Sequence, residues 1–429
     1  MQVGDVGDAD SFRLTDILVR GVGSDKMRID CVVVGAGPAG IAMSGALRDR
    51  DIEHVVLERD RVGTTWRTQR WDTFRLNTPG YMNDVLGDVT RDSFSTAAEV
   101  VTLLEQRATD LPVRQQSPVQ SLRRDGDDYV VQTPDEEYRT TGVVIATGNL
   151  NVPRVPPIAQ QLADDMDQQH ASAYRNAEQL PPGGVLVIGS AQSGCQIAED
   201  LVANGRRVYL STCHVGRLPW RYRGRDTVEW LRDAGFWDQR PEDLEDPAAM
   251  RLAQPVVASG GRDLSLQMLS RSGVTLLGHL ASIDDGIATF DDSTAANIAF
   301  ADEFARRIRT TVDNFIERSG ATAPPDHDDA AGGQVETTSP DTLDLRDSDI
   351  NSVVWATGFT GDYSWLHLPI LDDAGQPAHV DGATTEPGVW FIGLPWLSRR
   401  NSGIFYGFPV DADRIASAIS TRVSDRKGA

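Results

Sequence analysis

The stretch that decides the fold is Arg28-Ile-Asp-Cys-Val-Val-Val-Gly-Ala-Gly-Pro-Ala-Gly-Ile41. Its β-branched run predicts a buried parallel strand over residues 29–34, followed by a tight glycine turn and an apolar helix. Gly35 permits the turn, Gly37 lets the backbone approach a pyrophosphate, and Gly40 lets the helix pack closely on the strand. The phosphates would lie at the helix N-terminus, where free N–H groups and the helix dipole favour negative charge.

An acidic residue further along the chain supports a dinucleotide site. His54-Val-Val-Leu-Glu58 is predicted as the second strand, and its final acid follows Gly35 by 23 residues. A carboxylate at this position can hold the ribose hydroxyls of a dinucleotide. The alternative is a nucleotide-free unit in which the glycines serve packing alone.

The same pattern returns 154 residues later in Gly184-Val-Leu-Val-Ile-Gly189-Ser-Ala-Gln-Ser-Gly194. A strand, a glycine turn and a helix are again predicted, with Ala191 in place of the middle glycine. Alanine adds one methyl group and leaves slightly less room for a pyrophosphate. The candidate contacts in this turn are Gly189, Ser190, Ala191, Gln192, Ser193 and Gly194.

The end of the second strand differs between the two units. The second unit has Ser211 and Thr212 where the first has Glu58, and Arg206, Arg207, Arg217 and Arg221 lie nearby in sequence. A carboxylate would repel a 2′-phosphate, whereas hydroxyl and guanidinium groups accept one. The second site is therefore predicted to prefer NADPH over NADH, with Ser211, Thr212 and Arg217 as phosphate ligands. The alternative is that these arginines belong to a solvated surface.

Two similar strands with small-residue turns suggest how the chain is divided. Val143-Val-Ile-Ala-Thr-Gly148 recurs as Val353-Val-Trp-Ala-Thr-Gly358, and we expect the second copy to return the chain to the first domain. The predicted fold is α/β with two Rossmann-like domains, the first discontinuous in sequence. The predicted division is an extension over 1–27, a first domain over 28–155, a second domain with a helical insertion over 156–345, in which helices are expected over 227–234 and 295–318, and the rest of the first domain over 346–429.

Composition limits the classes of function. With 41 basic and 63 acidic side chains, the net charge of −22 disfavours nucleic acid and anionic membranes as partners. The three cysteines have no CxxC spacing, so neither a disulfide framework nor a redox pair is indicated, and no metal site is expected. No apolar run approaches the ~20 residues of a membrane span, and a cytoplasmic location is the default expectation.

Six motifs in order carry a family resemblance: GAGPAG from Gly35, GTTWR from Gly63, LNTP from Leu76, the first ATG, GSAQSG from Gly189 and WATGF from Trp355. This series resembles the flavin-containing monooxygenases, class B, most closely their bacterial single-component members. It covers residues 29 to about 410.

The resemblance implies FAD in the first domain and NADP in the second. It implies that Asn77 lies near the flavin and helps the oxygen adduct at flavin C4a to survive. The other residues that it implies around FAD are Gly35, Gly37, Pro38, Ala39, Gly40, Glu58, Arg59, Thr65, Trp66, Arg67, Val119, Ala146, Thr147 and Gly148. The reaction would be reduction of the flavin by NADPH, formation of a flavin hydroperoxide with O₂, and oxygen transfer to a small substrate.

One departure from the family pattern bears on the reaction. The fingerprint FxGxxxHxxx plus an aromatic residue would fall on residues 164–174, where His170 and Tyr174 fit but Asp164 and Met166 replace Phe and Gly. A typical Baeyer–Villiger fingerprint is therefore absent, which favours oxygenation of nitrogen or sulfur. His170 itself is expected to be a structural residue of the linker.

Several alternatives stay open at this point. Within enzymes they are a Baeyer–Villiger oxygenase and an NADPH oxidase that makes peroxide. Outside enzymes, a flavin-binding sensor without turnover is compatible with the residues. The sequence leaves the substrate and the oligomeric state open, with a homodimer among the options.

Overall fold

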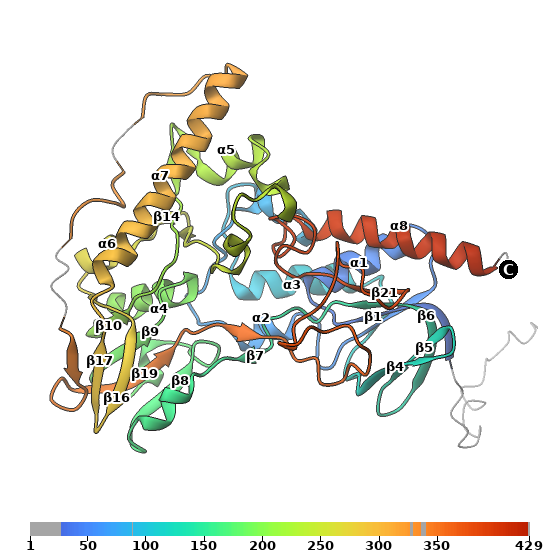
Figure 1. The fold of residues 1–429 in the computed structure, drawn as a ribbon, viewed down its shortest axis with the longest axis horizontal. Helices are drawn as coiled ribbons and strands as arrows, with labels where there is room; N and C mark the ends of the chain where they lie inside the picture. The colour runs from blue at the N-terminus through green and yellow to red at the C-terminus, as the bar shows by residue number, and fades with distance from the viewer. Residues whose placement is uncertain (1–26, 88, 327–328, 336–339, 428–429) are drawn as a thin grey trace, which may run out of the picture.

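The protein folds around two parallel sheets that lie side by side (Figure 1). The computed structural model describes residues 27–87, 89–326, 329–335 and 340–427. Apart from Met27, the predicted extension over 1–27 lies outside this range. The two α/β units confirm the predicted fold class.

The first sheet has the order β3-β2-β1-β6-β5-β4, with β21 added on β6. Strands β1, β2, β3, β6 and β21 run parallel, and β4 and β5 form an antiparallel extension. Its strands are β1 (Met27–Val34), β2 (His54–Leu57), β3 (Val113–Arg114), β4 (Ser121–Asp125), β5 (Asp128–Gln132), β6 (Glu137–Ile145) and β21 (Val389–Phe391).

Helices α1 (Pro38–Arg48) and α8 (Phe408–Lys427) pack against each other over one face of the first sheet (Figure 1). Val32 and Val33 of strand β1 are fully buried, as expected for a strand covered on both faces. Helices α2 (Thr64–Thr68) and α3 (Ala97–Ala108) complete this unit, and a capping box of Thr96 and Glu99 starts α3.

The second sheet has the order β15-β10-β9-β19-β8, all parallel. Its strands are β8 (Asp167–His170), β9 (Gly184–Ile188), β10 (Val208–Ser211), β15 (Thr275–Leu277) and β19 (Ile350–Trp355). Helices α4 (Gln192–Ala203) and α6 (Leu266–Arg271) cover one face, and a smaller antiparallel sheet packs near the other. That sheet consists of β16 (Leu280–Asp284), β17 (Ile287–Phe290) and β18 (Thr342–Asp344).

The position of β19 corrects one prediction. Residues 351–358 were expected to return the chain to the first domain, but β19 lies between β9 and β8 in the second sheet. The reason is that each glycine turn requires a neighbouring strand that ends in a small-residue turn: β6 supplies it to the first unit and β19 to the second. The chain re-enters the first sheet only with β21, so the first domain is discontinuous, as predicted, but the predicted start at residue 346 is wrong.

A helical insertion forms a third apolar cluster above the seam between the two sheets. Helices α5 (Thr227–Asp233) and α7 (Thr294–Ser319) agree with the predicted helices, and α7 rises well away from the sheets (Figure 1). The cluster includes Trp230, Trp237 and Val312 from the insertion, together with Tyr81 and Met82 from the first unit. The remaining strands pair as β7 (Val152–Pro153) with β20 (Phe359–Thr360), β11 (Arg221–Tyr222) with β12 (Arg225–Asp226), and β13 (Ala258–Ser259) with β14 (Arg262–Asp263).

Candidate active site

The three glycines of the first turn occupy different structural environments. Gly35 has φ +104°, and a Cβ there would lie 2.9 Å from the carbonyl oxygen of Ala146. A Cβ on Gly40 would lie 1.9 Å from the carbonyl oxygen of Gly35. Gly37, by contrast, has no atom within 4 Å of an added Cβ. The fold therefore requires Gly35 and Gly40, whereas Gly37 borders open space.

The groups around that space fit a dinucleotide. Gly37 is the N-cap of α1 and caps it with no side chain, so the N–H groups of the first turn face outward beside Pro38 and Ala39. The Oγ1 atom of Thr147, in the neighbouring ATG turn, is buried without a hydrogen-bond partner. An unpaired buried hydroxyl is costly to the protein alone and is expected where a ligand supplies the partner.

Glu58 fixes the turn to the end of β2. It is 9% exposed, and its carboxylate accepts hydrogen bonds from Ala36 N (2.8 Å) and Asp60 N (3.0 Å). The loop after β3 runs alongside, since Ser117 N donates to the carbonyl oxygen of Glu58. Val119 follows in this loop and packs against the core of the first unit; its proximity to the adenine stays a prediction.

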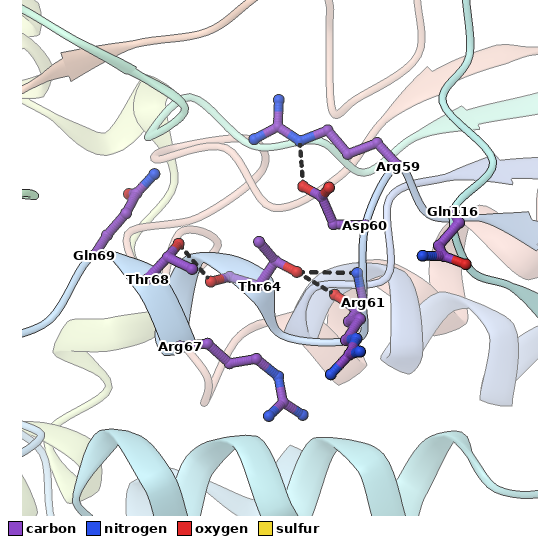
Figure 2. A pocket seen from close by; sticks show the side chains of 8 residues that line it. All are labelled: Arg59, Asp60, Arg61, Thr64, Arg67, Thr68, Gln69 and Gln116. Atoms are coloured by element: carbon purple, nitrogen blue, oxygen red, sulfur yellow. Dashed lines mark hydrogen bonds and ion pairs between the residues drawn. The ribbon is translucent and has the colours of Figure 1, made fainter.

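A polar depression of about 510 Å³ opens next to Glu58 (Figure 2). Arg59, Arg61 and Arg67 make it basic. Arg67 extends toward α3, where it donates to Glu105, and Arg59 pairs with Asp60 (3.5 Å). Its lining is Arg59, Asp60, Arg61, Thr64, Arg67, Thr68, Gln69 and Gln116, so the structure gathers Arg59 and Arg67 but places their charges beside carboxylates.

The loop that follows α2 carries an aromatic cluster at the seam between the units. The ring of Trp66 lies 6.0 Å from that of Phe74 and 5.4 Å from that of Phe405. The Arg70 guanidinium stacks 4.7 Å from the Trp66 ring, and burial lowers the pKa of Arg70 to about 10. Asn77, further along this loop, is partly buried, and its amide makes no hydrogen bond within the described chain. Its side chain therefore remains available to a ligand.

The second turn repeats the first. Gly189 has φ +104°, and a Cβ on Gly194 would lie 1.9 Å from the carbonyl oxygen of Gly189. Ala191 takes the place of Gly37 as the N-cap of α4. Two predicted contacts here already have partners: Ser190 Oγ accepts from Cys213 N (3.0 Å), and Gln192 bonds the backbone of Val257 and Ala258. Ser193, on the first turn of α4, is partly exposed.

The structure opposes the predicted ligands of the 2′-phosphate. Ser211 and Thr212 are 2% and 0% exposed. Ser211 Oγ donates to the carbonyl oxygen of Gly278 (2.9 Å), and Thr212 Oγ1 donates to that of Leu277 (2.7 Å). Both hydroxyls anchor the end of β10 to the backbone at residues 277–278, so neither is available to a cofactor phosphate.

Arg217 is likewise a structural residue. It is 3% exposed and lies between Asp302 and Asp329, with N–O distances of 2.7 and 2.6 Å. Burial would raise the pKa of Asp329, but the hydrogen bond and the charge of Arg217 outweigh it, and the pKa is lowered. The sequence put arginines near the strand end, but only the fold shows that the carboxylates of α7 and residue 329 reach Arg217.

The other arginines of this region also have protein partners. Arg206 donates to backbone carbonyls, including that of Gly183 (3.0 Å), and Arg207 pairs with Asp349 (3.3 Å). Arg221 pairs with Asp226 (3.2 Å). None of these arginines therefore supports the prediction that the second unit prefers NADPH.

Sequence reasoning missed the residues that join the two units. Asp200 on α4 accepts hydrogen bonds from Thr73 (2.7 Å) and from Tyr174 (2.5 Å); Thr73 lies in the loop that follows α2, which we call the aromatic loop. Asn176 donates to Asp72 (2.7 Å) in the same seam. The contacts Thr73–Asp200 and Asp72–Asn176 link residues 127 and 104 positions apart, so no local pattern in the sequence signals them.

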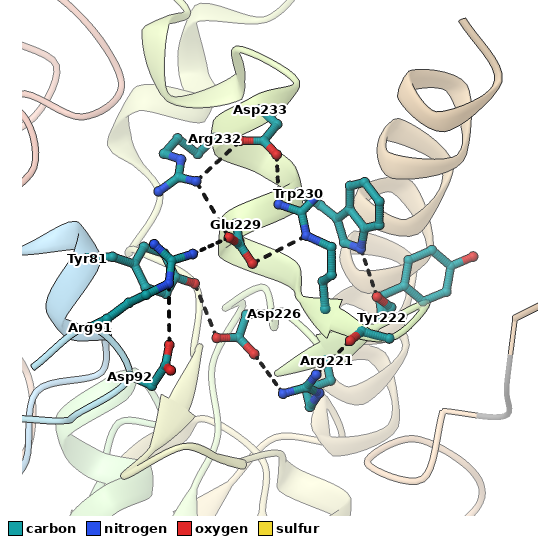
Figure 3. Close-up of polar contacts among 12 residues, drawn as sticks. Tyr81, Arg91, Asp92, Arg221, Tyr222, Asp226, Glu229, Trp230, Arg232 and Asp233 are labelled. Carbon is teal, nitrogen blue, oxygen red and sulfur yellow. Dashed lines mark hydrogen bonds and ion pairs between the residues drawn. The ribbon is translucent and has the colours of Figure 1, made fainter. Parts of the chain in front are cut away.

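A second network joins the first unit to the insertion (Figure 3). Glu229 on α5 pairs with Arg91 (2.5 Å), Arg225 (3.3 Å) and Arg232 (3.6 Å). The hydroxyl of Tyr81 donates to Asp226 (3.2 Å). The loop is thus tied to α4 before Asn77, through Thr73, and to the insertion after Asn77, through Tyr81 and Arg91.

His170 has the structural role that we expected. Its Nδ1 accepts from Ser172 N (3.1 Å), so the proton lies on Nε2, which donates to the carbonyl oxygen of Gly358 (2.9 Å). Burial lowers the pKa of His170. The residue therefore fixes the second ATG turn as a neutral imidazole.

Comparisons with known proteins agree with this architecture. Residues 32–233 match the family model described as pyridine nucleotide-disulphide oxidoreductase. An uncharacterized CzcO-like oxidoreductase of Geobacillus kaustophilus is 28% identical over 399 residues, covering 91% of this chain and 98% of that protein. The probable indole-3-pyruvate monooxygenase YUCCA1 of Arabidopsis thaliana is 30% identical over 209 residues, which cover 46% of this chain and 50% of that protein.

Solved structures share the fold. The flavin-containing monooxygenase from Stenotrophomonas maltophilia superposes with a TM-score of 0.66 at 17% identity, covering 92% of this chain and 99% of that one. The complex of OTEMO with FAD and NADP gives a TM-score of 0.53 at 17% identity, covering 93% of this chain and 86% of that one.

The fold and the two turns define a two-domain dinucleotide oxidoreductase. Taken with the ordered motifs, the comparisons agree with the family resemblance: the chain is similar to an oxidoreductase along most of its length and to a flavin monooxygenase over about half of it. The predictions of an enzyme and of FAD and NADPH as its cofactors agree with that class.

Proposed function

We propose that this chain is a monooxygenase that uses FAD and NADPH to oxygenate a small substrate containing nitrogen or sulfur. The observation that carries the proposal is the pair of glycine turns, each beside its own ATG turn, on two units joined at one seam. Bound FAD would supply the redox chemistry, since it accepts a hydride and reacts with O₂. The protein contributes binding, orientation and control of water.

The first unit would hold FAD along the edge from Gly37 to Glu58. The open space at Gly37 and the unpaired hydroxyl of Thr147 support the pyrophosphate position, and Glu58 lies where the ribose would be. The second unit would hold NADPH on α4, with Ala191 at the pyrophosphate. The side chain that reads its 2′-phosphate lies outside the set of Ser211, Thr212 and Arg217.

The seam would bring the two cofactors together and exclude water from the reaction. Trp66, Phe74 and Phe405 give it an apolar wall, and the hydrogen bonds to Asp200 fix the aromatic loop against α4. Asn77 would face the flavin as a neutral hydrogen-bond donor that stabilises the oxidant until the substrate arrives. We assign no general base, because a sulfur or uncharged nitrogen atom of a substrate is already nucleophilic and would need no deprotonation by the protein.

Two features favour nitrogen or sulfur as the atom oxygenated. Residues 164 and 166 lack the Phe and Gly of the Baeyer–Villiger fingerprint, and His170 is held by Gly358 and Ser172 rather than facing a site. Baeyer–Villiger oxygenation and an NADPH oxidase remain the alternatives among enzymes. A cytoplasmic location and a homodimer stay predictions; no helix in the described ranges is both long and apolar enough to cross a bilayer.

Stopped-flow absorbance tests the proposal. The purified flavoprotein is reduced with NADPH without oxygen and is then mixed with oxygenated buffer. We expect a spectrum distinct from both the reduced and the oxidised flavin, with a decay that an amine or sulfide substrate accelerates. Immediate return of the oxidised spectrum with stoichiometric peroxide would instead indicate an oxidase, and failure of NADPH to reduce the flavin would exclude the assignment.

A further inference from the structure

One loop runs from the FAD turn to the insertion. It starts at Gly393, where an added Cβ would lie 2.7 Å from the Cβ of Ala39 at the start of α1. It returns at Phe405, whose ring packs on Trp66. Between these points the backbone N–H groups of Arg400 and Asn401 donate to the carbonyl oxygens of Gln239 (2.8 Å) and Trp237 (3.2 Å). Residues 394–407 therefore span the wall between the flavin side of the seam and the insertion, and we call them the wall loop.

Arg400 carries an uncompensated charge on this loop. Its guanidinium stacks 4.2 Å from the Phe236 ring and 4.5 Å from the Trp396 ring. Its Nε and Nη2 atoms donate to the neutral Oε1 of Gln239, at 3.2 and 2.6 Å, and no carboxylate pairs with it among the described residues. Burial lowers the pKa of Arg400 to about 10, so it remains a cation at neutral pH. Its remaining N–H groups are left for another acceptor.

The next residue has an unused donor. Asn401 is 2% exposed, and its Nδ2 is buried without a hydrogen-bond partner. Leaving a buried amide unpaired costs stability, and such groups are rare unless a ligand completes them. Two consecutive residues therefore carry a cation that no carboxylate pairs with in the described part of the chain and a buried donor without an acceptor, and an anionic group would suit both.

The wall loop is braced in a strained conformation. Trp396 has φ +55°, in the left-handed region that tryptophan rarely adopts. Ser402 Oγ accepts from Ser398 N (3.1 Å) and Arg399 N (3.0 Å), and Ser398 donates to Asp411 (2.5 Å). A fixed loop holds its side chains ready for a ligand and lowers the entropic cost of binding.

We infer that Arg400 and Asn401 bind the carboxylate of an organic-acid substrate whose body packs on the aromatic residues of the seam. A guanidinium in contact with aromatic rings keeps its N–H groups for other acceptors, and its planar fork suits two parallel hydrogen bonds to a carboxylate. The dinucleotide phosphates are expected at the N-termini of α1 and α4, so they do not account for this site. The inference rests on the proposed function, which it narrows to acids bearing the oxygenated nitrogen or sulfur.

A matched pair of probes tests the charge. (Phenylthio)acetate and (phenylthio)acetamide share the sulfur and the ring and differ in the negative charge. Each is titrated into the oxidised holoenzyme, and binding is followed by calorimetry and by the flavin difference spectrum. We expect the acid to bind about ten-fold or more tightly than the amide, as for a hydrogen-bonded ion pair.

Variants test whether Arg400 causes the preference for the acid over the amide. Arg400→Gln should abolish the preference for the acid and leave the affinity for the amide within about two-fold, because only the charged contact is lost. Arg399→Gln is the matched control: this neighbour pairs with Asp238 (3.4 Å), so the preference should remain. Arg400→Lys, which keeps the charge without the planar edge, should give an intermediate preference and decides the matter if Arg400→Gln loses flavin.

Clear results would overturn the inference. They are equal affinity of the wild type for acid and amide, no saturable binding of the acid, or equal losses in Arg399→Gln and Arg400→Gln. The rate of flavin reduction by NADPH separates this inference from the proposed function. Wild type that prefers the acid but is not reduced by NADPH keeps the carboxylate site and loses the monooxygenase assignment.

Discussion

The two dinucleotide units have the same skeleton and different details. Gly35 and Gly189 have the same φ of +104°, and Gly40 and Gly194 have the same 1.9 Å approach to the preceding turn. At the middle position the first unit has Gly37 beside open space, and the second has Ala191. Positions that the backbone dictates are therefore identical, and positions that face a ligand have diverged.

The ATG turns show the same division. The hydroxyl of Thr147 is buried and unpaired, whereas that of Thr357 donates to the carbonyl oxygen of Arg154. After β2, the carboxylate of Glu58 accepts a hydrogen bond from the glycine turn. At the end of β10, the hydroxyls of Ser211 and Thr212 donate to backbone oxygens of residues 277–278. The first unit leaves the hydroxyl of its ATG turn unpaired, while the second unit satisfies the corresponding hydroxyl internally.

The largest expected effect separates backbone from ligand requirements. Gly40→Ala should prevent accumulation of folded protein, because its methyl group meets a backbone oxygen that cannot move without breaking the turn. Gly194→Ala should do the same in the second unit. Circular dichroism and soluble yield measure this, with Gly45→Ala in α1 as a control, where an added Cβ meets nothing. Normal folding of both turn variants would show that the turns can open.

Arg217→Ala should destabilise the protein by about 1.5 to 3 kcal/mol, because it removes a buried guanidinium that is hydrogen-bonded to the partly exposed carboxylates of Asp302 and Asp329. The ratio of KM values for NADPH and NADH should not change. Urea denaturation measures stability, and Arg207→Ala, at an exposed ion pair, should cost less than about 1 kcal/mol. A selective rise in KM for NADPH would restore Arg217 to phosphate recognition.

Acid titration sharpens this test. The pKa of Asp329 is lower in the folded than in the unfolded state. The ionised side chain therefore contributes its full stabilisation of the folded state above the ordinary carboxylate pKa, and this stabilisation is lost as the pH falls through the lowered pKa. In Arg217→Ala the part of that contribution due to Arg217 is lost, so the stability difference between variant and wild type should shrink on acidification. A constant difference down to pH ~3 would contradict the role of the pair.

Gly37→Val should remove FAD without unfolding the chain, because the new side chain enters open space where the pyrophosphate is expected. We expect colourless protein with a native circular dichroism spectrum and at least a hundred-fold weaker FAD binding, about 2.7 kcal/mol or more. Ala191→Val is the counterpart in the second unit and should raise KM for NADPH while FAD remains. A yellow Gly37→Val protein with full flavin content would refute the first assignment.

Asn77→Ala should leave reduction by NADPH unchanged and release several-fold more peroxide per NADPH, about 1 kcal/mol of lost stabilisation of the oxidant. A coupled peroxidase assay beside NADPH consumption measures this. Asn83→Ala is an instructive comparison, since that buried amide bonds the carbonyl oxygens of Thr78 and Pro79 and should affect stability first. Unchanged coupling in Asn77→Ala would count against its proposed role.

The smallest effect concerns the end of β10. Ser211→Ala should cost about 1 kcal/mol of stability through the lost hydrogen bond to Gly278. The preference between NADPH and NADH should change less than two-fold, well below the effect of a lost phosphate contact. A large shift of that preference would reverse the structural assignment of the hydroxyl.

Local chemistry made much of the protein predictable. The strand–turn–helix units follow from β-branched runs and from glycines at fixed spacing, because those constraints act within a few residues. Helix α7 and the structural role of His170 were foreseen for the same reason. The order of six short motifs was enough to indicate the class of enzyme.

Other features depended on contacts distant in sequence. The sheet to which β19 belongs was misassigned because two strands with the same local ending serve different turns. Arg217 could be taken for a phosphate ligand because the carboxylates that neutralise it lie 85 and 112 residues away.

The sequence by itself determined the two dinucleotide units, the acid at Glu58 and the family resemblance, since these depend on residues that are neighbours along the chain. Only the tertiary structure decided which polar groups are already satisfied. It paired Ser211, Thr212 and Arg217 and left Thr147, Arg400 and Asn401 with unused capacity. Hydrogen bonding and charge neutralisation are properties of neighbours in space, and the candidate ligand contacts emerge only when those neighbours are known.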